Sequence, residues 1–550
     1  MTQFNVLVTD EIDPDGLEIL RAAPNLIVDE RPTMPRDQLR AIIGDYDAFI
    51  GRSATQLPAE LLSHATKLRV IGRAGVGIDN IDIPAATALG IAVINAPAGN
   101  TVSVAELFFG SLISLSRHLP VATRSMRDGR WDRSALLGTE LRGRTLGIVG
   151  LGRIGSEVAR RARAFEMSVV AYDPYVTDQR FDVLRVARAT TLDDLLGTAD
   201  VVTVHTPLTD ETRGMIGERE LARMRADAVV ANMARGGIVN EAALIAALTS
   251  GHLRGALLDV FQKEPLAADS PLRALDNVVL TPHLGASTAE GQRNVAVDVC
   301  ESVRDALLTG ELSRAINVGG VTHDRWLTLQ PALTLTQRAA RVARVLLAER
   351  GGRAIDQIAL RISTDLADAA GVLLSSAAVG VLEDIASGER LNLVNARSHA
   401  ESRGVLMGVT ITPGEDLVGA ISVSVCAAAN QMAVSGTAIG QVGRLTKIGQ
   451  FTIDVTPRRT LLVLRNRDVP GVIGRVGTLL GTESVNIAEY HQSRVVQGGD
   501  ALAAVTLDAP LNESQRQRLL SLPDIYSVSV INFEDGARAS SGDDVTNGNL

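Results

Sequence analysis

The feature that most constrains the fold is a glycine-rich loop at residues 150–155, which reads Gly-Leu-Gly-Arg-Ile-Gly. It follows Thr145–Val149, a short apolar run that we predict to be a buried strand, and it precedes Ser156–Phe165, which has the pattern of a helix. Ser168–Tyr172 then has the pattern of a second strand. A strand, a glycine turn, a helix and a strand predict a βαβ unit of a parallel sheet, and in this context the loop indicates a dinucleotide site.

Each glycine of the loop has its own physical role in such a site. Gly150 permits the tight turn, Gly152 lets a pyrophosphate approach the backbone, and Gly155 lets the helix lie close to the strand. Asp173 lies 18 residues after Gly155, at the end of the second strand. Its carboxylate can accept hydrogen bonds from a ribose diol and repels a 2′-phosphate, so the pattern favours NAD over NADP. The alternative is a glycine-rich turn that binds no cofactor.

Composition limits the class of protein. A chain of 550 residues is long enough for about three or four domains, and 46% hydrophobic residues suffice for several packed cores. The formal net charge of −9 comes without a basic block, which argues against nucleic acid or an anionic membrane as a partner. Cys300 and Cys426 lie far apart, which predicts neither a disulfide framework nor a metal site and fits a reducing cytoplasm.

Neither a signal peptide nor a membrane span is predicted. Met1–Thr9 lacks the basic start and apolar core of a signal peptide. The uncharged run at 417–443 is long enough to cross a bilayer, but it contains Asn430, Gln431 and Gln441 beside several Ser, Thr and Gly. We therefore predict that this run forms sheet with turns.

The first half of the chain alternates short apolar runs with helical stretches. The predicted strands outside the glycine unit are Phe4–Thr9, Ala48–Gly51, Val70–Arg73, Ala92–Asn95, Val201–His205, Ala228–Met233, Gly255–Val260 and Val278–Thr281. Such alternation predicts parallel sheets with helices on both faces. We expect two such sheets, because the dinucleotide unit begins only near residue 145.

The order of these elements predicts a discontinuous first domain. A boundary near residues 97–100 precedes a long helix from about Ser103 to Leu119, which we expect to bridge two lobes. A capping box at Ser287-Thr288-Ala289-Glu290 begins another helix, which returns the chain to the first lobe. The expected organisation is a substrate-binding lobe of residues 1–98 and 289–317, with a Rossmann-like NAD-binding lobe of residues 99–288 inserted into it.

The C-terminal part differs in character. Residues 320–455 show fewer strand–helix alternations and more Ala and Ser. Residues 459–533 contain strands and helices in the order βαββαβ, from Leu461–Leu464 to Ile525–Ile531, which predicts a ferredoxin-like module. Residues 534–550 are rich in Gly, Ser, Asp and Asn, and we predict that they are disordered.

Three residues of the inserted lobe are candidates for catalysis. His283 directly follows a strand, at the edge where ligands bind in open α/β sheets, and can exchange a proton with a substrate hydroxyl. Glu264 can pair with the imidazole, and Arg235 can clamp a carboxylate with its planar fork. The alternatives are a structural His, a Glu in a turn and an Arg that caps a helix. Their positions after three successive strands favour catalysis.

Several motifs, taken in order, resemble those of one family. They are Gly51–Thr55, Gly72–Asn80, the glycine loop, His205–Leu208, Asn232–Gly237, Asp259–Phe261 and Thr281–Ser287. Over its whole length apart from the tail, the chain resembles the D-isomer-specific 2-hydroxyacid dehydrogenase family, in the long form that acts on 3-phosphoglycerate.

The resemblance implies roles for the residues that match the motifs. Arg235 holds the substrate carboxylate and oxygen, His283 donates and accepts the proton, and Glu264 supports it. The implied cofactor contacts are Gly150, Gly152, Arg153, Ile154, Gly155, Asp173, Thr206, Met233, Ala234, Arg235, Asp259, His283, Leu284, Gly285 and Ala286. The implied substrate contacts are Arg52 and Ser53 at the 3-phosphate, then Arg73 and Asn100, and Arg133 reaching across a dimer.

The implied reaction is the NAD-dependent oxidation of 3-phosphoglycerate to 3-phosphohydroxypyruvate, the first step of serine biosynthesis. The alternatives are another D-2-hydroxyacid dehydrogenase that acts on glyoxylate or hydroxypyruvate, a 2-oxoglutarate reductase, and a cofactor-sensing scaffold without turnover. The resemblance also implies a homo-oligomer, either a dimer or a tetramer, and closure of the two lobes over the substrate.

The two C-terminal parts resemble regulatory domains. Residues 320–455 resemble an α+β allosteric substrate-binding domain, and residues 459–533 resemble an ACT domain that binds serine between two subunits. Asp468 and Asn486 match the effector contacts, with Asn466 as a third, although the shorter bacterial form carries a histidine at that position. The alternative is a module used only for contacts in an oligomer.

Overall fold

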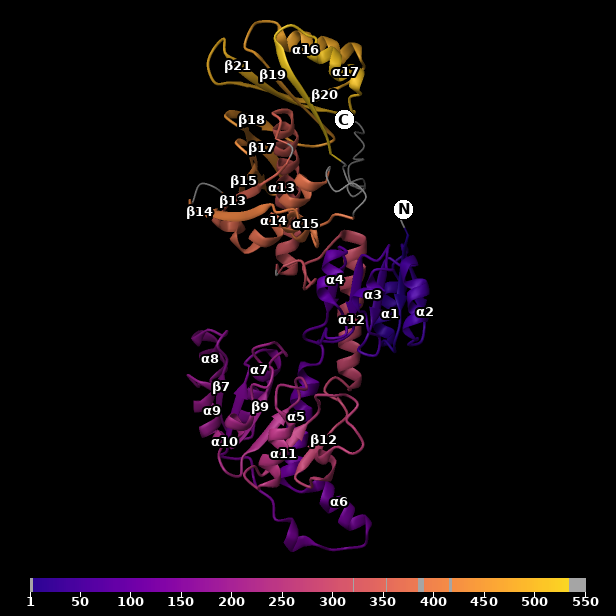
Figure 1. Ribbon diagram of the computed structural model, residues 1–550, viewed down its shortest axis with the longest axis vertical. Helices are drawn as coiled ribbons and strands as arrows, with labels where there is room; N and C mark the ends of the chain where they lie inside the picture. The colour runs from indigo at the N-terminus through magenta and orange to yellow at the C-terminus, as the bar shows by residue number, and fades with distance from the viewer. Residues whose placement is uncertain (1–2, 320, 353, 384–389, 415–417, 534–550) are drawn as a thin grey trace, which may run out of the picture.

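The computed structural model describes residues 3–319, 321–352, 354–383, 390–414 and 418–533. Figure 1 shows an elongated molecule in which the sheets follow one another along the long axis. The segment predicted to be disordered, residues 534–550, lies outside the described residues.

The first sheet is parallel, in the order β2-β1-β3-β4-β5. Its strands are β1 (Phe4–Val8), β2 (Leu26–Glu30), β3 (Ala48–Gly51), β4 (Val70–Arg73) and β5 (Ala92–Asn95). The helices around it are α1 (Pro14–Arg21), α2 (Arg36–Ile42), α3 (Ala59–Leu62) and α4 (Ile83–Ala88), with the 3₁₀ turn η1 (Ile43–Asp45). The sequence analysis missed β2, because its apolar run, Leu26–Val28, is only three residues long and is followed by the charged residues Asp29 and Glu30.

The second sheet is also parallel, in the order β12-β11-β10-β9-β6-β7-β8. Its strands are β6 (Thr145–Val149), β7 (Ser168–Tyr172), β8 (Ala187–Arg188), β9 (Val201–Val204), β10 (Val229–Asn232), β11 (Gly255–Leu258) and β12 (Val278–Leu280). The helices are α5 (Thr101–Ser116), α6 (Leu119–Arg127), α7 (Arg153–Ala164), α8 (Asp178–Leu184), α9 (Leu192–Thr198), α10 (Glu218–Arg223) and α11 (Glu241–Thr249), with η2 (Arg133–Leu136) and η3 (Pro271–Ala274). The two predicted parallel sheets are confirmed.

Three helix boundaries differ from the prediction. α7 begins at Arg153 rather than Ser156, so the glycine loop leads directly into the helix. α5 ends at Ser116, because His118 adopts a left-handed φ of 53° and a separate helix follows it. α12 (Ala289–Thr309) is capped by Thr288, whose Oγ1 accepts from Gly291 N at 3.0 Å, and not by the predicted capping box.

The third sheet is mixed, in the order β14-β13-β15-β16-β17-β18. Its strands are β13 (Gln357–Ser363), β14 (Leu406–Thr412), β15 (Ala420–Ala427), β16 (Asn430–Ile439), β17 (Val442–Ile448) and β18 (Phe451–Val455). The helices are α13 (His323–Glu349), α14 (Ala370–Leu382) and α15 (Ala396–Ser402), preceded by η4 (Thr364–Ala369). Of the uncharged run 417–443, the described residues 418–443 contain β15, β16 and the start of β17, so the predicted sheet with turns is confirmed there.

One helical segment is long and apolar enough to cross a membrane, by length and composition alone. It is Thr364–Leu382, with a mean hydropathy of 1.5, and the sequence analysis did not single it out. Because 72% of it is buried inside the protein, it has the character of a core helix.

The fourth sheet is antiparallel, in the order β20-β21-β19-β22. Its strands are β19 (Thr460–Arg467), β20 (Ile487–Arg494), β21 (Asp500–Leu507) and β22 (Ile525–Asn532), and its helices are α16 (Val472–Thr482) and α17 (Glu513–Leu520). This order, with one helix after β19 and one after β21, confirms the ferredoxin-like module.

The apolar cores divide the molecule into two parts. One continuous cluster runs from the first sheet through α12 and α13 to the third sheet and to Leu461, Val463 and Ile531 on one face of the fourth. The second sheet has clusters of its own, which contain residues between Val104 and Leu272 only. α12 connects the two parts. It follows the second sheet in sequence, and it packs against α1 and β4 of the first.

Candidate active site

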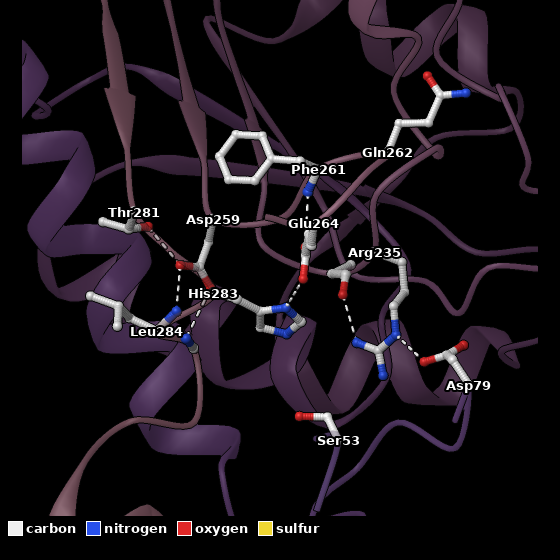
Figure 2. Close-up of polar contacts among 12 residues, drawn as sticks. Ser53, Asp79, Arg235, Asp259, Phe261, Gln262, Glu264, Thr281, His283 and Leu284 are labelled. Atoms are coloured by element: carbon white, nitrogen blue, oxygen red, sulfur yellow. Dashed lines mark hydrogen bonds and ion pairs between the residues drawn. The ribbon is translucent and has the colours of Figure 1, made fainter. Parts of the chain in front are cut away.

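His283 and Glu264 form a hydrogen-bonded pair beside the carboxyl edge of the second sheet. His283 Nδ1 lies 2.7 Å from Glu264 Oε2, and Glu264 Oε1 accepts from the backbone N–H of Phe261 at 3.0 Å (Figure 2). An ionised carboxylate can only accept, so Nδ1 carries the proton of a neutral imidazole. Nε2 is then the nitrogen left to exchange a proton with a ligand.

A buried carboxylate fixes the loop that carries His283. Asp259, which is 1% exposed, accepts from Thr281 Oγ1 at 2.6 Å and from the backbone N–H groups of Leu284 and Gly285 at 2.7 and 2.8 Å. His283 itself adopts a left-handed φ of 56°, a conformation that costs energy in a non-glycine residue and persists only where the surroundings hold it. The hydrogen bonds of the Asp259 carboxylate to the residues on either side of His283 fix this conformation (Figure 2).

Arg235 reaches across to the first sheet. Its Nε donates to Asp79 Oδ2 at 2.9 Å, and its Nη1 donates to the carbonyl of Ala234 at 2.6 Å. Asn232, which is 2% exposed, fixes the loop that carries Arg235. Its side chain donates to the carbonyl of Arg235 and accepts from Ala234 N. Sequence reasoning quoted Asp79 and Asn232 within motifs but assigned a role to neither, because only the fold pairs them with Arg235.

Arginines from the two parts of the molecule gather at this site. Burial first, and then the positive charges of Arg235 and Arg52, lower the pKa of the Arg73 guanidinium to about 10. The Nε of Arg73 is buried without a hydrogen-bond partner among the described residues. Ser53 lies on the same side as the ends of His283 and Arg235 in Figure 2. Crowded cations with an orphaned N–H group favour an anionic ligand.

Two other predicted substrate contacts have different surroundings. The side-chain oxygen of Asn100, which precedes α5, is buried without a partner among the described residues. Arg133 lies in η2, in the segment that follows α6 and projects from the lower end of the molecule in Figure 1. No bond joins Arg133 to the other site residues in the described part of the chain.

The glycine loop has the geometry that its sequence predicts. Gly150 has a φ of 94°, and a Cβ on Gly155 would come within 2.1 Å of the Gly150 carbonyl, whereas a Cβ on Gly152 would meet open space. Asp173 Oδ2 accepts from Leu151 N at 2.8 Å, and its Oδ1 accepts from Tyr175 N at 3.0 Å. The carboxylate is thus tied to the glycine loop and keeps lone pairs for a ribose.

Two buried polar atoms beside this loop lack a hydrogen-bond partner among the described residues. They are Thr206 Oγ1 and His205 Nδ1, and the carbonyl of His205 lies next to Gly150. Burial lowers the pKa of His205 to about 4, so its ring is neutral. Orphaned polar atoms next to an open glycine cradle fit a dinucleotide that supplies the missing hydrogen bonds.

The remaining predicted cofactor contacts lie at the same edge of the sheet. They are Arg153 and Ile154 after β6, Met233 and Ala234 after β10, and Leu284 to Ala286 after β12. Because β6, β9, β10, β11 and β12 are consecutive neighbours in the sheet, these loops form one continuous rim.

The predicted effector residues fall into two groups within one chain. Asn466 and Asp468 lie at the end of β19, where Asp468 binds Arg494 at 2.8 Å, and Gly498 N–H and Arg494 hold its pKa below the usual value. Asn486 donates to Asp508 at 2.6 Å, beside the start of β19. In the sheet, Asn466 pairs with Ala501, while the residue after Asn486 pairs with Leu507. Six residues of strand separate the groups by about 20 Å.

Comparison with known proteins agrees with this geometry. Residues 109–285 match the family model described as the NAD-binding domain of D-isomer specific 2-hydroxyacid dehydrogenases. The chain is 39% identical to a D-3-phosphoglycerate dehydrogenase from Synechocystis sp., with 96% of this chain and 95% of that one covered. It is 38% identical to the enzyme of the same name from Bacillus subtilis, with 96% and 100% covered.

Solved structures resemble just over half of the chain. A protein from Thermus thermophilus matches with a TM-score of 0.53 and 35% identity, and a glyoxylate reductase from Paecilomyes thermophila matches with 0.53 and 32%. Each match covers 57% of this chain and 99% of the other. The likeness to these structures therefore covers just over half of the chain, whereas the two relatives named above match 96% of it in sequence.

Proposed function

The chain belongs to the D-3-phosphoglycerate dehydrogenases of the D-isomer specific 2-hydroxyacid dehydrogenase family, and we propose that Arg235, Glu264 and His283 carry its reaction. It is an NAD-dependent dehydrogenase that oxidises 3-phosphoglycerate at C2, giving 3-phosphohydroxypyruvate for serine biosynthesis. The observation that carries the proposed roles is the convergence of the His283–Glu264 pair and the Arg235 fork at one edge of the second sheet.

In the oxidative direction, His283 Nε2 takes the proton of the C2 hydroxyl. Glu264 accepts from Nδ1 at 2.7 Å and so stabilises the imidazolium that forms. The outer N–H groups of Arg235 hold the substrate carboxylate and the C2 oxygen. When bound, NAD supplies the acceptor for the hydride that leaves C2. Lobe closure excludes water from this step and brings Arg52 and Ser53 to the substrate.

The charges at the site support a phosphorylated acid as substrate. 3-Phosphoglycerate carries both a carboxylate and a phosphate. Three cations lie near this site: Arg73 ends β4, Arg52 follows β3, and Arg235 follows β10 of the other sheet. A glyoxylate or 2-oxoglutarate reductase needs no phosphate ligand. Arg52 with Ser53 is therefore assigned to the 3-phosphate, with Asn100 as a further contact.

The cofactor contacts are assigned to the rim described above. Arg153 and Ile154 form the N-terminus of α7, which is assigned to the pyrophosphate. Asp173 is assigned to the adenosine ribose, and the dinucleotide would supply the hydrogen bond that Thr206 Oγ1 lacks. The discontinuous lobes 1–98 with 289–317 and 99–288 are proposed as the substrate-binding and NAD-binding domains.

A second copy of the chain is part of the proposed enzyme. The segment around α6 exposes Met126, Trp131 and Leu137 to solvent, at 56%, 78% and 88%. Apolar side chains this exposed favour a partner that covers them. We assign this segment to a dimer contact that carries Arg133 to the active site of the other subunit, in a cytoplasmic homo-oligomer.

Serine is proposed as the effector of the C-terminal module. Asn466 and Asp468 lie about 20 Å from Asn486 in one chain, so a small amino acid can touch both groups only where two modules meet. Residues 459–533 are accordingly proposed as an ACT domain, and residues 320–455 as an allosteric substrate-binding domain.

An assay of substrates side by side tests the function. NADH absorbance is followed with 3-phosphoglycerate, with glycerate, and in the reverse direction with glyoxylate and 2-oxoglutarate. We expect 3-phosphoglycerate to exceed glycerate by at least about 10²-fold in kcat/KM, because glycerate lacks the group that Arg52 binds. Equal rates with glycerate would reject the phosphate site, and the absence of turnover would favour a cofactor-sensing scaffold.

A further inference from the structure

Asp79 and Arg235 form an ion pair between the two parts of the molecule. Asp79 lies in the loop after β4 of the first sheet, Arg235 lies in the loop after β10 of the second, and Arg235 Nε donates to Asp79 Oδ2 at 2.9 Å. Among the described residues it is the one ion pair between 3–98 and 99–288. The first and second sheets have separate apolar cores, so this contact forms or breaks when the two parts approach or separate.

The pair also sets the direction of the guanidinium. Nε is held by Asp79 and Nη1 by the carbonyl of Ala234, so acceptors from both parts of the molecule fix one plane. Nη2 lies over Gly77, where a Cβ would come within 1.9 Å of it. The N–H groups that remain on Nη1 and Nη2 are those that can bind a planar carboxylate.

Asp79 has an electrostatic effect on the same site. The positive charges of Arg235 and Arg52 act to lower the pKa of Arg73, and the negative charges of Asp79 and Asp10 act to raise it. The Asp79 side chain is 64% exposed, so its pairing is screened by salt and is readily reversible. A reversible anchor can order Arg235 in the closed enzyme without locking the lobes.

We infer that Asp79 is a positioning residue, which orients the Arg235 fork toward the substrate carboxylate only when the two lobes have closed. The inference rests on the proposed role of Arg235. Without the Asp79 carboxylate, the fork loses one of its two acceptors, and the substrate must order it on binding. The loss therefore appears in substrate binding and turnover, whereas the glycine loop and Asp173, which make no bond to Asp79 in the described part of the chain, keep their contacts for NAD.

Asp79→Ala, Asp79→Asn and the control Glu290→Gln test this inference in the full-length enzyme. Glu290 is an exposed carboxylate beside the lobe connection, with no bond to Arg235. We expect Asp79→Ala to raise the KM for 3-phosphoglycerate about tenfold and to lower kcat several-fold, Asp79→Asn to fall between, and the control to match the parent. The Kd for NADH, measured by fluorescence, stays within about twofold. A KM that falls would instead mean that Asp79 competes with the substrate, and an equal loss of NADH affinity would mean a general structural role; either overturns the inference.

A double-mutant cycle with Arg235→Lys separates this inference from the proposed function. If Asp79 acts through Arg235, then Asp79→Ala changes the KM of the Arg235→Lys enzyme by less than about twofold. An undiminished effect in that background overturns the inference and leaves the function intact. If Arg235→Lys alone leaves kcat/KM for 3-phosphoglycerate unchanged, the role of Arg235 fails, and the inference fails with it.

Discussion

Glu264 holds the imidazole of His283 and its own loop at once. One carboxylate oxygen lies 2.7 Å from His283 Nδ1, and the other accepts from the N–H of Phe261 at 3.0 Å. The ring orientation therefore depends on the loop after β11 as well as on the loop after β12. Arg235, from the loop after β10, completes the group, so three neighbouring strands of one sheet carry the proposed chemistry.

His283→Ala should reduce kcat by about 10²-fold or more, because the imidazole is the proposed proton acceptor and the Glu264 carboxylate lies behind it, at Nδ1. NADH binding should remain nearly unchanged, since His283 is one of many assigned cofactor contacts and the glycine loop and Asp173 lie elsewhere on the rim. Steady-state rates and NADH fluorescence titration measure the two quantities. If turnover and NADH affinity fell together, His283 would be a structural residue.

Asp259→Asn should destabilise the enzyme by about 1–3 kcal/mol and reduce kcat. The amide places an NH₂ group where the carboxylate now accepts from Thr281, Leu284 and Gly285, so at least one buried donor loses its acceptor. Thermal unfolding and kcat are measured together, with Asp269→Asn as the control at an exposed carboxylate. Unchanged stability in the Asp259 variant would contradict the proposed hold on the His283 loop.

The sequence predicted the second sheet well because its elements are specified locally. Gly150 and Gly155 are required by a left-handed turn and a close backbone approach, and a run of apolar residues precedes each loop. β2 was not predicted, because its apolar run is only three residues long and two charged residues follow it. Asp79 and Asn232 escaped as site residues because their partners are fixed only by the fold: Asp79 meets a residue 156 positions away.

Acid should weaken the fold through His205. Burial lowers its pKa from 6.5 to about 4 in the folded protein. Between pH 6.5 and about 4, His205 is therefore protonated in the unfolded chain but not in the folded protein. The free energy of unfolding is highest above pH 6.5 and decreases by up to about 3 kcal/mol as the pH falls toward 4. Urea unfolding at pH 7 and pH 5 should show this loss, and His205→Gln should reduce it. An equal loss in the variant would assign it to other groups.

Asp173→Ala should relax the preference for NAD over NADP. Asp173 is tied to Leu151 and Tyr175 at the end of β7, where its charge repels a 2′-phosphate. We expect kcat/KM with NAD to fall about tenfold or more and the value with NADP to rise, with kcat for the bound ternary complex little changed. Asp178→Ala, at an exposed position in α8, serves as the control. A variant that kept its full preference for NAD would reject Asp173 as the discriminating residue.

Serine regulation should require two chains, and mixed oligomers can test it. Deleting residues 456–550 is unsuitable, because Leu461, Val463 and Ile531 share a core with the third sheet and their loss would expose it. Asn466→Ala and Asn486→Ala each leave that core intact, and each should abolish inhibition by serine when alone. Oligomers reassembled from the two variants should regain part of the inhibition, since one site then pairs an intact Asn466 with an intact Asn486 across the contact. No recovery in verified hybrids would place the effector within a single module, contrary to the separation of about 20 Å between the two groups.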